Sequence, residues 1–332
     1  MRLPIIGVIL GDAAGIGPEI VAKMHVEKKF QNYCRPVVIG DRRVLERGFS
    51  VIGEPAELQV IQAVAQADWS AGGLPVLDLP MERFENVLYG RLNADCGAVC
   101  VQQIRTAVAL YRKGEVQGVC YAPLNKGAMI KGGNPVESEL ELAAMLLGCQ
   151  DAYCETNMVD NIWTTRVTSH VPLCEVSKHL SIEGITKNIA LCNKTLLKAG
   201  YAHPRIGVAA LNPHAGENGL CGREEIDLIA PAIKQAQELG INATGPYASD
   251  TLFVRAFDHK EFDGAVTMFH DQGQIALKLK GFSRGVTIGG GLDMPFTTCA
   301  HGTAFDIAGR GIASTTAFEN AIFQVSKMAA NG

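Results

Sequence analysis

A short loop near the end of the chain combines a histidine, a carboxylate and several glycines. In segment 300–311 the glycines are Gly302, Gly309 and Gly311, and Asp306 lies between them. Glycine permits backbone turns that a β-carbon would forbid, and a carboxylate can accept hydrogen bonds from ribose hydroxyls. These residue types predict a loop that wraps a nucleotide.

Two of the eight histidines come just after short apolar runs that are typical of strands. His214 follows the run 206–211, and His270 directly follows the run 264–269. Ligands of open α/β sheets lie beyond the carboxyl ends of the strands, so side chains at these points are candidates for chemistry. A lone histidine is more often a core or surface residue than a ligand, so the residues alone leave both interpretations open.

Alternating strands and helices must position these loops. Short apolar runs predict strands at 4–10, 36–40, 118–122, 206–211 and 264–269. Helical patterns separate them, most clearly at 18–28, 93–112, 182–197 and 223–239. Such alternation predicts an α/β fold with largely parallel sheets covered on both faces. Because no Pro/Gly/Ser linker divides the chain, we expect residues 1–332 to form one unit of two interleaved α/β lobes with an active-site cleft between them.

Composition excludes several classes of protein. The 30 basic and 34 acidic residues give a net charge of −4, without a long basic stripe, so no nucleic-acid partner is expected. The run 4–10 is a strand-like segment and lacks the features of a signal peptide. No apolar run approaches the roughly 20 residues of a membrane-spanning helix. We therefore expect a cytoplasmic protein that does not contact a membrane.

The ten cysteines are sparse for a chain of 332 residues. Cys96 and Cys100 come closest to the spacing of a metal-ligand pair, but both fall within the helical pattern 93–112. Buried thiols in a reducing compartment are favoured over a zinc site.

Two segments at opposite ends of the chain resemble the metal-dependent β-decarboxylating dehydrogenases, the isopropylmalate and isocitrate enzymes. One is the loop 300–311, and the other is Gly-Asp-Ala-Ala-Gly-Ile-Gly-Pro-Glu at 11–19. Segments between them resemble the 4-hydroxythreonine-4-phosphate dehydrogenase (PdxA) family in order and spacing. These segments are 122–126, 169–173, 211–217, 245–251 and 269–273, the last followed by Lys278. The resemblance runs from about residue 4 to the C-terminus and implies the isocitrate/isopropylmalate dehydrogenase-like fold.

The resemblance implies a metal site and groups for proton transfer. The histidines of three of these motifs would bind one divalent cation, Zn²⁺, Mn²⁺, Co²⁺ or Ni²⁺, with Mg²⁺ a further option. They are His170, His214 and His270. Catalytic candidates at family active-site positions are Lys278, Asp250 and Asp271. Asp271 could instead cap a helix that starts near Gly273. Four other histidines lie in helical or polar surroundings and are expected to be solvated. They are His25, His179, His203 and His259.

The resemblance also implies a dinucleotide cofactor. Its expected contacts are His301, Gly302, Thr303, Ala304, Asp306, Ile307 and Asn212. A carboxylate at Asp306 would accept from a ribose 2'-hydroxyl and repel a 2'-phosphate, which favours NAD over NADP. Segment 11–17 has the wrong glycine spacing for the Rossmann fingerprint, and the chain has no P-loop.

The chain departs from the family where the substrate phosphate would bind. Family members carry a His-Thr-Glu triplet, an Asn and an Arg, whereas this chain places Glu139 and Leu140 in the triplet region, Thr287 for the Asn and Phe296 for the Arg. Lys126 is either a substrate contact or a solvated lysine. A phosphate dianion needs convergent donors, so these replacements indicate a different substrate. The pattern resembles the branch that oxidises the cis-dihydrodiol of terephthalate.

We therefore expect an NAD- and metal-dependent dehydrogenase of a small hydroxy acid, in many cases with decarboxylation, whose substrate is not phosphorylated. One alternative is a genuine 4-hydroxythreonine-4-phosphate, threonate 4-phosphate or erythronate 4-phosphate dehydrogenase. Others are a non-catalytic binding protein on the same fold and an enzyme that uses the metal without redox chemistry. Relatives are homodimers in which a metal ligand crosses between subunits, so the resemblance implies a homodimer.

Overall fold

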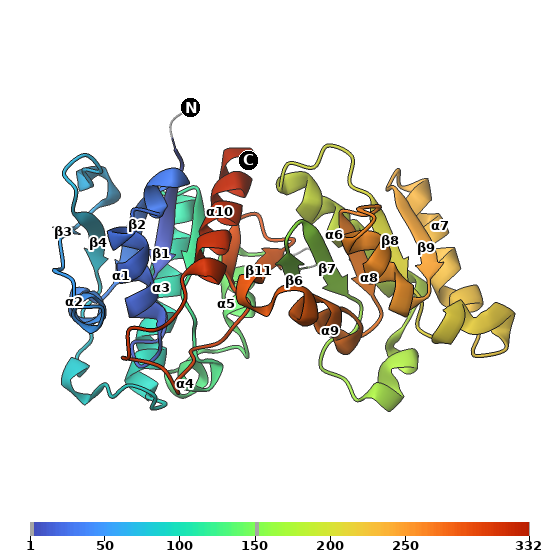
Figure 1. Cartoon of the computed structure of the whole chain (residues 1–332), viewed down its shortest axis with the longest axis horizontal. Coiled ribbons are helices and arrows are strands. Elements are labelled where there is room, and N and C mark those ends of the chain that lie inside the picture. Colours follow the sequence, from blue (N-terminus) through green and yellow to red (C-terminus); the bar gives the residue numbers. More distant parts are fainter. Residues whose placement is uncertain (1–2, 150–152, 332) are drawn as a thin grey trace. The chain divides into compact units, whose positions relative to one another are not determined.

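The computed structural model describes residues 3–149 and 153–331. The chain divides into two compact units (Figure 1). Unit 1 contains Met1–Gln150 and Leu292–Gly332, and unit 2 contains Asp151–Gly291. The chain therefore leaves unit 1, builds unit 2 and returns. Both units are mixed α/β structures, which confirms the fold class expected from the sequence.

Unit 1 is built on a parallel sheet with the strand order β3-β4-β2-β1-β5-β12. Its strands are β1 Ile5–Ile9, β2 Arg35–Gly40, β3 Leu58–Ile61, β4 Leu74–Asp78, β5 Gly118–Tyr121 and β12 Phe296–Cys299. Its α-helices are α1 Gly17–Val26, α2 Arg42–Val51, α3 Ala94–Arg112, α4 Lys126–Lys131, α5 Glu139–Leu147 and α10 Thr316–Asn331. The C-terminal helix α10 packs on β5 and β12, which brings the end of the chain onto the N-terminal sheet (Figure 1).

Unit 2 has the strand order β11-β6-β7-β10-β8-β9. Its strands are β6 Cys154–Val159, β7 Ile162–Arg166, β8 Ile206–Ala209, β9 Ala243–Tyr247, β10 Gly264–Thr267 and β11 Val286–Gly290. Its α-helices are α6 Ile182–Lys198, α7 Ala230–Glu238, α8 Ser249–Phe257 and α9 His270–Gly281. The pairs β6/β7 and β6/β11 are antiparallel, while β7, β10, β8 and β9 run parallel.

Helices α6 and α9 cover opposite faces of the β7/β10 pair. Gly264 approaches Cys192 of α6, whereas Thr164 approaches Gly273 of α9. Gly264 pairs with Trp163, the residue before Thr164, and successive residues of a strand point to opposite faces. The two-sided covering predicted for a parallel sheet is confirmed for this pair.

The predicted helices at 18–28, 93–112 and 182–197 agree with α1, α3 and α6 to within two residues. The predicted helix 223–239 is divided, however, into a π-helical turn at Glu225–Ile229 and α7 at Ala230–Glu238. Pro231 lies in the first turn of α7. Proline has no N–H to donate, which disfavours a continuous α-helix through this point.

The cysteines of α3 are core residues. Cys96 and Cys100 are each 1% exposed, and burial raises the pKa of the Cys96 thiol to about 12. The prediction of buried thiols is confirmed for this pair. His25 is not simply solvated as expected, because it is half-buried and packs edge-on against Phe49, with 5.9 Å between the ring centroids.

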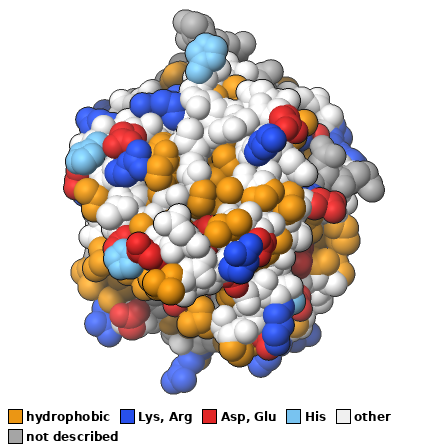
Figure 2. Space-filling view, turned by 90° about the vertical axis from the view of Figure 1, so that its right-hand side faces the viewer, with side chains coloured by type: hydrophobic (Ala, Val, Ile, Leu, Met, Phe, Trp, Pro, Cys, Tyr) orange, Lys and Arg blue, Asp and Glu red, His pale blue; other side chains and the backbone are white. Residues whose placement is uncertain are grey.

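In the described part of the chain, no helix is both long and apolar enough to span a membrane. On the face that Figure 2 shows, basic and acidic side chains alternate, with apolar side chains between them.

Candidate active site

The three histidines named from the sequence all lie in unit 2, after the carboxyl ends of neighbouring strands. His170 follows β7, His270 follows β10 and His214 follows β8. Strand β10 pairs in parallel with both β7 and β8, so these carboxyl ends lie at the same edge of the sheet. The topology thus places the loops of all three histidines at one edge, where α/β folds bind ligands.

His170 and His270 are close to each other. Their ring centroids lie 6.3 Å apart with an angle of 38° between the ring planes. His270 Nδ1 lies 2.7 Å from Asp271 Oδ1. A carboxylate on one ring nitrogen fixes the orientation of the imidazole and increases the basicity of the other nitrogen, an arrangement common in metal-binding histidines.

His214 lies on a loop whose start is hydrogen-bonded to a buried glutamate. Residues 214–218 all have positive φ, between 44° and 78°. Glu225, 3% exposed, accepts hydrogen bonds from the backbone N–H groups of Leu211 and Asn212, both at 2.8 Å. The Asn212 side chain donates to Glu225 at 2.9 Å and to Glu224 at 2.7 Å. Asn212, expected to contact the cofactor, therefore anchors this loop.

Within residues 3–149 and 153–331, no group of three or more His, Cys, Asp or Glu side chains is assembled closely enough to hold a metal ion. The structure thus brings His170 and His270 together and places His214 at the same sheet edge. The three-histidine site remains a prediction.

The catalytic candidates Lys278, Asp250 and Asp271 are exposed residues of α8 and α9. Helix α9 starts at His270 and not near Gly273, so Asp271 lies inside the first turn and does not cap the helix from outside. Asp271 instead contacts His270. This corrects the expected capping position.

Gln272 is a positioning residue that the sequence analysis did not identify. Its side chain accepts from Met268 N at 2.8 Å and donates to Ala210 O at 2.8 Å and Ser249 Oγ at 3.0 Å. One amide group thereby ties the ends of β10 and β8 to the start of α8. The only signal in the sequence is its place in the His-Asp-Gln-Gly motif, beside His270.

A buried arginine lies next to one of the predicted substrate positions of unit 2. Asn157 donates to Thr287 Oγ1 at 3.0 Å and accepts from Arg166 Nη1 at 2.7 Å. Arg166, 9% exposed, also donates to Ser169 Oγ at 2.9 Å, and its Nη2 lies 3.4 Å from Glu155 Oε1. A cation is therefore linked to Thr287 through Asn157, although 285–309 contains no Lys or Arg.

The predicted substrate positions of unit 1 surround Tyr121. Glu139, the first residue of α5, accepts from the Tyr121 hydroxyl at 3.3 Å, and Tyr121 stacks on Phe296 with centroids 4.5 Å apart. Glu139 Oε2 is buried and has no hydrogen-bond partner among the described residues. Leu140 is half-buried against the same core, and Lys126 is exposed at the start of α4.

Phe296 was expected to face an apolar or uncharged portion of the substrate, and this expectation is wrong. It is 1% exposed and packs within the hydrophobic core of unit 1. A substrate could not contact this buried ring. The effect of Phe296 is therefore that the arginine of family members is absent here, and the ring does not form an apolar wall of the substrate site. Glu139 is the more accessible of the two replacements.

The two glycine-rich segments of unit 1 contact each other. Ile16 N donates to Thr303 O at 3.2 Å, and a β-carbon at Gly15 would lie 3.0 Å from Thr303. Glu19, 2% exposed, accepts from Gly309 N at 3.1 Å and Ala313 N at 3.2 Å. A buried carboxylate of α1 therefore holds the end of the loop 300–311.

The loop 300–311 has the backbone that its glycines predict. Gly309 and Gly311 have φ values of 78° and 67°. A β-carbon at Gly309 would overlap the Tyr89 ring, so this position requires glycine for space as well as for its positive φ. Asp306 is exposed on the loop. The other predicted cofactor contacts of the loop are His301, Gly302, Thr303, Ala304 and Ile307, all in this segment.

Comparison with protein families matches residues 32–325 to the family described as pyridoxal phosphate biosynthetic protein PdxA. The D-threonate 4-phosphate dehydrogenase of Cupriavidus necator is 39% identical over 98% of this chain and 98% of its own length. The 4-hydroxythreonine-4-phosphate dehydrogenase of Desulforapulum autotrophicum is 37% identical over 98% of this chain and 95% of its own.

Solved structures agree. A 4-hydroxythreonine-4-phosphate dehydrogenase from Klebsiella pneumoniae has a TM-score of 0.88 at 36% identity and covers 98% of both chains. A terephthalate 1,2-cis-dihydrodiol dehydrogenase from Burkholderia xenovorans has a TM-score of 0.66 at 25% identity, also over 98% of both chains. This chain is thus more similar to the former protein than to the dihydrodiol enzyme.

Proposed function

The chain belongs to the PdxA family, and because the relatives compared above are named as dehydrogenases, we propose that it is a cytoplasmic NAD- and divalent-metal-dependent dehydrogenase of a small hydroxy acid. The dehydrogenase relatives support catalysis over a non-catalytic binding role. The observation that carries the proposal is the placement of His170, His270 and His214 after the carboxyl ends of three adjacent parallel strands.

The donor set of unit 2 fits a divalent cation. Imidazoles are neutral ligands suited to Zn²⁺, Mn²⁺, Co²⁺ or Ni²⁺, and the Asp271 contact to His270 Nδ1 leaves Nε2 as the ligating atom. A bound cation would lower the pKa of a substrate hydroxyl and stabilise the enolate that decarboxylation leaves.

The chain's own residues orient the histidines and move protons. Asp271 holds the His270 ring, while Gln272 ties the strand ends that carry His270 and His214. Lys278 and Asp250 are exposed titratable groups on α9 and α8, and we assign proton transfer to them. Their exposure keeps such protons in exchange with solvent.

Unit 1 supplies the proposed NAD site. The loop 300–311 rests on the 11–19 segment through Ile16 and Glu19, so its backbone is ordered before a ligand binds. Asp306 is exposed and available to accept from the ribose 2'-hydroxyl. NAD held by this loop would supply the hydride acceptor for oxidation of the substrate carbon.

The substrate proposal rests on Glu139. Glu139 is half-exposed, and its Oε2 has no hydrogen-bond partner among the described residues. A carboxylate at this position repels a phosphate dianion but attracts a hydroxyl or ammonium donor. We therefore propose a substrate without a phosphate at this position. The second candidate is a 4-phosphorylated hydroxy acid, favoured by the substrates named for the relatives and by the buried cation Arg166 beside Thr287.

Steady-state NAD reduction distinguishes these candidates. The panel comprises D-threonate 4-phosphate, 4-hydroxythreonine 4-phosphate, their unphosphorylated forms and cyclic cis-dihydrodiol acids, each with Zn²⁺, Mn²⁺, Co²⁺, Ni²⁺ or Mg²⁺. We expect kcat/KM to be highest for an unphosphorylated compound, and Glu139→His to improve the phosphorylated ones while Glu141→Gln does not. A wild-type preference for a 4-phosphate ester would decide for the second candidate.

We further propose a homodimer. Unit 2 exposes large apolar side chains, among them Leu173 at 71% and Leu220 at 83%, which follow His170 and His214 in the sequence, and Leu279 of α9 at 84%. Large apolar side chains left exposed in this way are typical of association surfaces when they gather on one face. Sedimentation velocity should give the mass of two chains, and a fully active monomer would contradict the proposal.

A further inference from the structure

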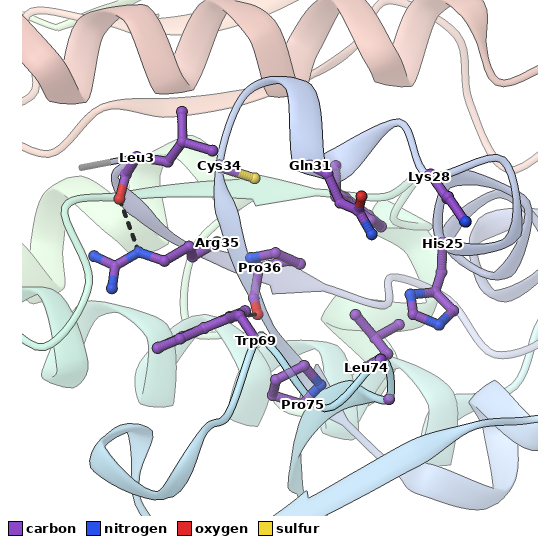
Figure 3. A pocket seen from close by; sticks show the side chains of 13 residues that line it. Leu3, His25, Lys28, Gln31, Cys34, Arg35, Pro36, Trp69, Leu74 and Pro75 are labelled. Carbon is purple, nitrogen blue, oxygen red and sulfur yellow. Dashed lines mark hydrogen bonds between the residues drawn. The ribbon is translucent and has the colours of Figure 1, made fainter. Parts of the chain in front are cut away.

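A cavity of about 300 Å³ lies in unit 1 at the amino ends of its strands (Figure 3). Leu3 precedes β1, Arg35 and Pro36 begin β2, and Leu74 and Pro75 begin β4. These strands are parallel, and the 11–19 segment follows the carboxyl end of β1. The cavity and the proposed NAD loop therefore lie at opposite edges of the same sheet.

The cavity has flat apolar walls. Trp69, Pro36, Leu74 and Pro75 line it, and the Trp69 indole N–H donates to Pro36 O at 2.9 Å. The Arg35 guanidinium lies 4.8 Å from the centre of the Trp69 ring, and Arg35 Nε donates to Leu3 O at 2.9 Å. The indole is thus held in place before any ligand arrives, which reduces the entropy cost of binding a flat molecule.

The polar groups of the cavity are cationic or neutral. Arg35 lies on the Trp69 side, while His25 and Lys28 lie on the other side, with Gln31 above (Figure 3). None of the described residues that line the cavity is Asp or Glu. The turn after α1 presents Lys28, whose φ is 58° and whose N–H donates to His25 O at 2.9 Å. The cavity therefore combines an apolar slot with positive charge on both sides.

We propose that this cavity is a second binding site, for a small planar organic anion: an aromatic or unsaturated ring that bears one carboxylate, sulfonate or phosphate group. The ring packs against Trp69 and the prolines, and the anionic group binds to Arg35 or Lys28. The volume lies at the lower end of the range for small-molecule pockets, which fits a compact ring and excludes a dinucleotide. The site is independent of the proposed NAD and metal sites.

Isothermal titration calorimetry with 1-naphthyl phosphate tests the proposal, with 1-naphthol as a control that has the same ring and no anion. We expect saturable binding of one 1-naphthyl phosphate per chain and at least about tenfold weaker binding of 1-naphthol, since a charge-assisted hydrogen bond contributes about that factor. Arg35→Gln and Lys28→Asn should each weaken binding of the phosphate. Asparagine tolerates the positive φ at position 28, so this exposed variant should fold even if Arg35→Gln does not.

Arg42→Gln is the matched control, because Arg42 is an exposed arginine at the start of α2, outside the cavity. It should bind 1-naphthyl phosphate as the wild type does. The titration is repeated with saturating NAD. Absence of saturable binding, equal binding of 1-naphthol, indifference to both Arg35→Gln and Lys28→Asn, or complete displacement by NAD would each overturn the proposal.

Discussion

Asp306 is the residue on which cofactor choice depends in this account. It is exposed on a loop whose backbone is fixed by Glu19 and by contact with the 11–19 segment. We predict that Asp306→Lys raises the KM for NAD at least about tenfold, the effect of losing one charge-assisted hydrogen bond, and lowers the KM for NADP. Asp306→Asn keeps an acceptor and should change the NAD value far less. Equal use of NAD and NADP by the wild type would refute this role.

Asp12 makes stability depend on pH. The residue is fully buried, and burial raises the pKa of its carboxyl above the usual value. A group with a raised folded-state pKa contributes its full stability below its unfolded pKa and loses that contribution as the pH rises through the folded value. Asp12→Asn, which can keep the hydrogen bond from Ala14 N, should therefore raise Tm, and by more at pH 8 than at pH 4. A constant difference between these pH values would contradict the prediction.

Sequence reasoning at the residue scale identified groups that belong to motifs and missed those whose roles arise from tertiary contacts. Asp306 and the three histidines follow recognisable patterns. Arg166 and Glu225 do not, because their roles come from buried hydrogen bonds, of Arg166 to Asn157 and of Asn212 to Glu225. Such burial is set by the packing of distant elements and leaves no local pattern.

The loop between β8 and the π-helical turn is anchored by one buried side chain. Glu225 accepts three hydrogen bonds from Leu211 and Asn212. His214 lies two residues after Asn212 on the same loop. Glu225→Gln places an amide N–H group against one of these donors. We predict a loss of about 1–3 kcal/mol of stability, the cost of leaving a buried polar group unpaired, together with weaker Zn²⁺ binding.

Glu238→Gln, at the exposed end of α7, is the matched control and should leave both quantities unchanged. Differential scanning calorimetry and equilibrium dialysis against Zn²⁺ measure the two effects. Unaltered Zn²⁺ binding in folded Glu225→Gln would show that this loop does not position a ligand.

The strands β1, β2, β5, β8 and β10 and the helices α1, α3 and α6 were predicted to within about two residues, because their hydrophobic patterns are local. The parallel strands β3, β4, β9 and β12 were not named from the sequence. The antiparallel pair β6/β7 was not predicted. Its strands alternate polar and apolar residues weakly, and Arg166, Thr164 and Asn157 are buried despite their polarity. The π-helical turn was also not predicted. The sequence indicated one α-helix over 223–239, and Pro231 alone does not show whether such a helix is kinked or begins with a π-helical turn.

At the scale of the whole molecule, each unit carries one part of the proposed chemistry. Unit 1 contains the loop 300–311 with its support on α1, and unit 2 contains the three histidine loops on adjacent strands. Interleaved lobes were expected from the sequence because no Pro/Gly/Ser linker divides it. The three-histidine ligand set rests on the resemblance and on sheet topology together, since the described residues assemble only His170 and His270 closely.

The most direct test of the account is Zn²⁺ binding to the full chain, measured by equilibrium dialysis for the wild type and for His214→Ala, with His203→Ala as an exposed control histidine in unit 2. Loss of one of three protein ligands should weaken Zn²⁺ binding by more than the roughly 10- to 100-fold expected for removing a group that only orients a ligand. His203→Ala should bind one Zn²⁺ per chain with the wild-type affinity. Stoichiometric Zn²⁺ at unchanged affinity in His214→Ala would contradict the proposed metal site and, with it, the proposed mechanism.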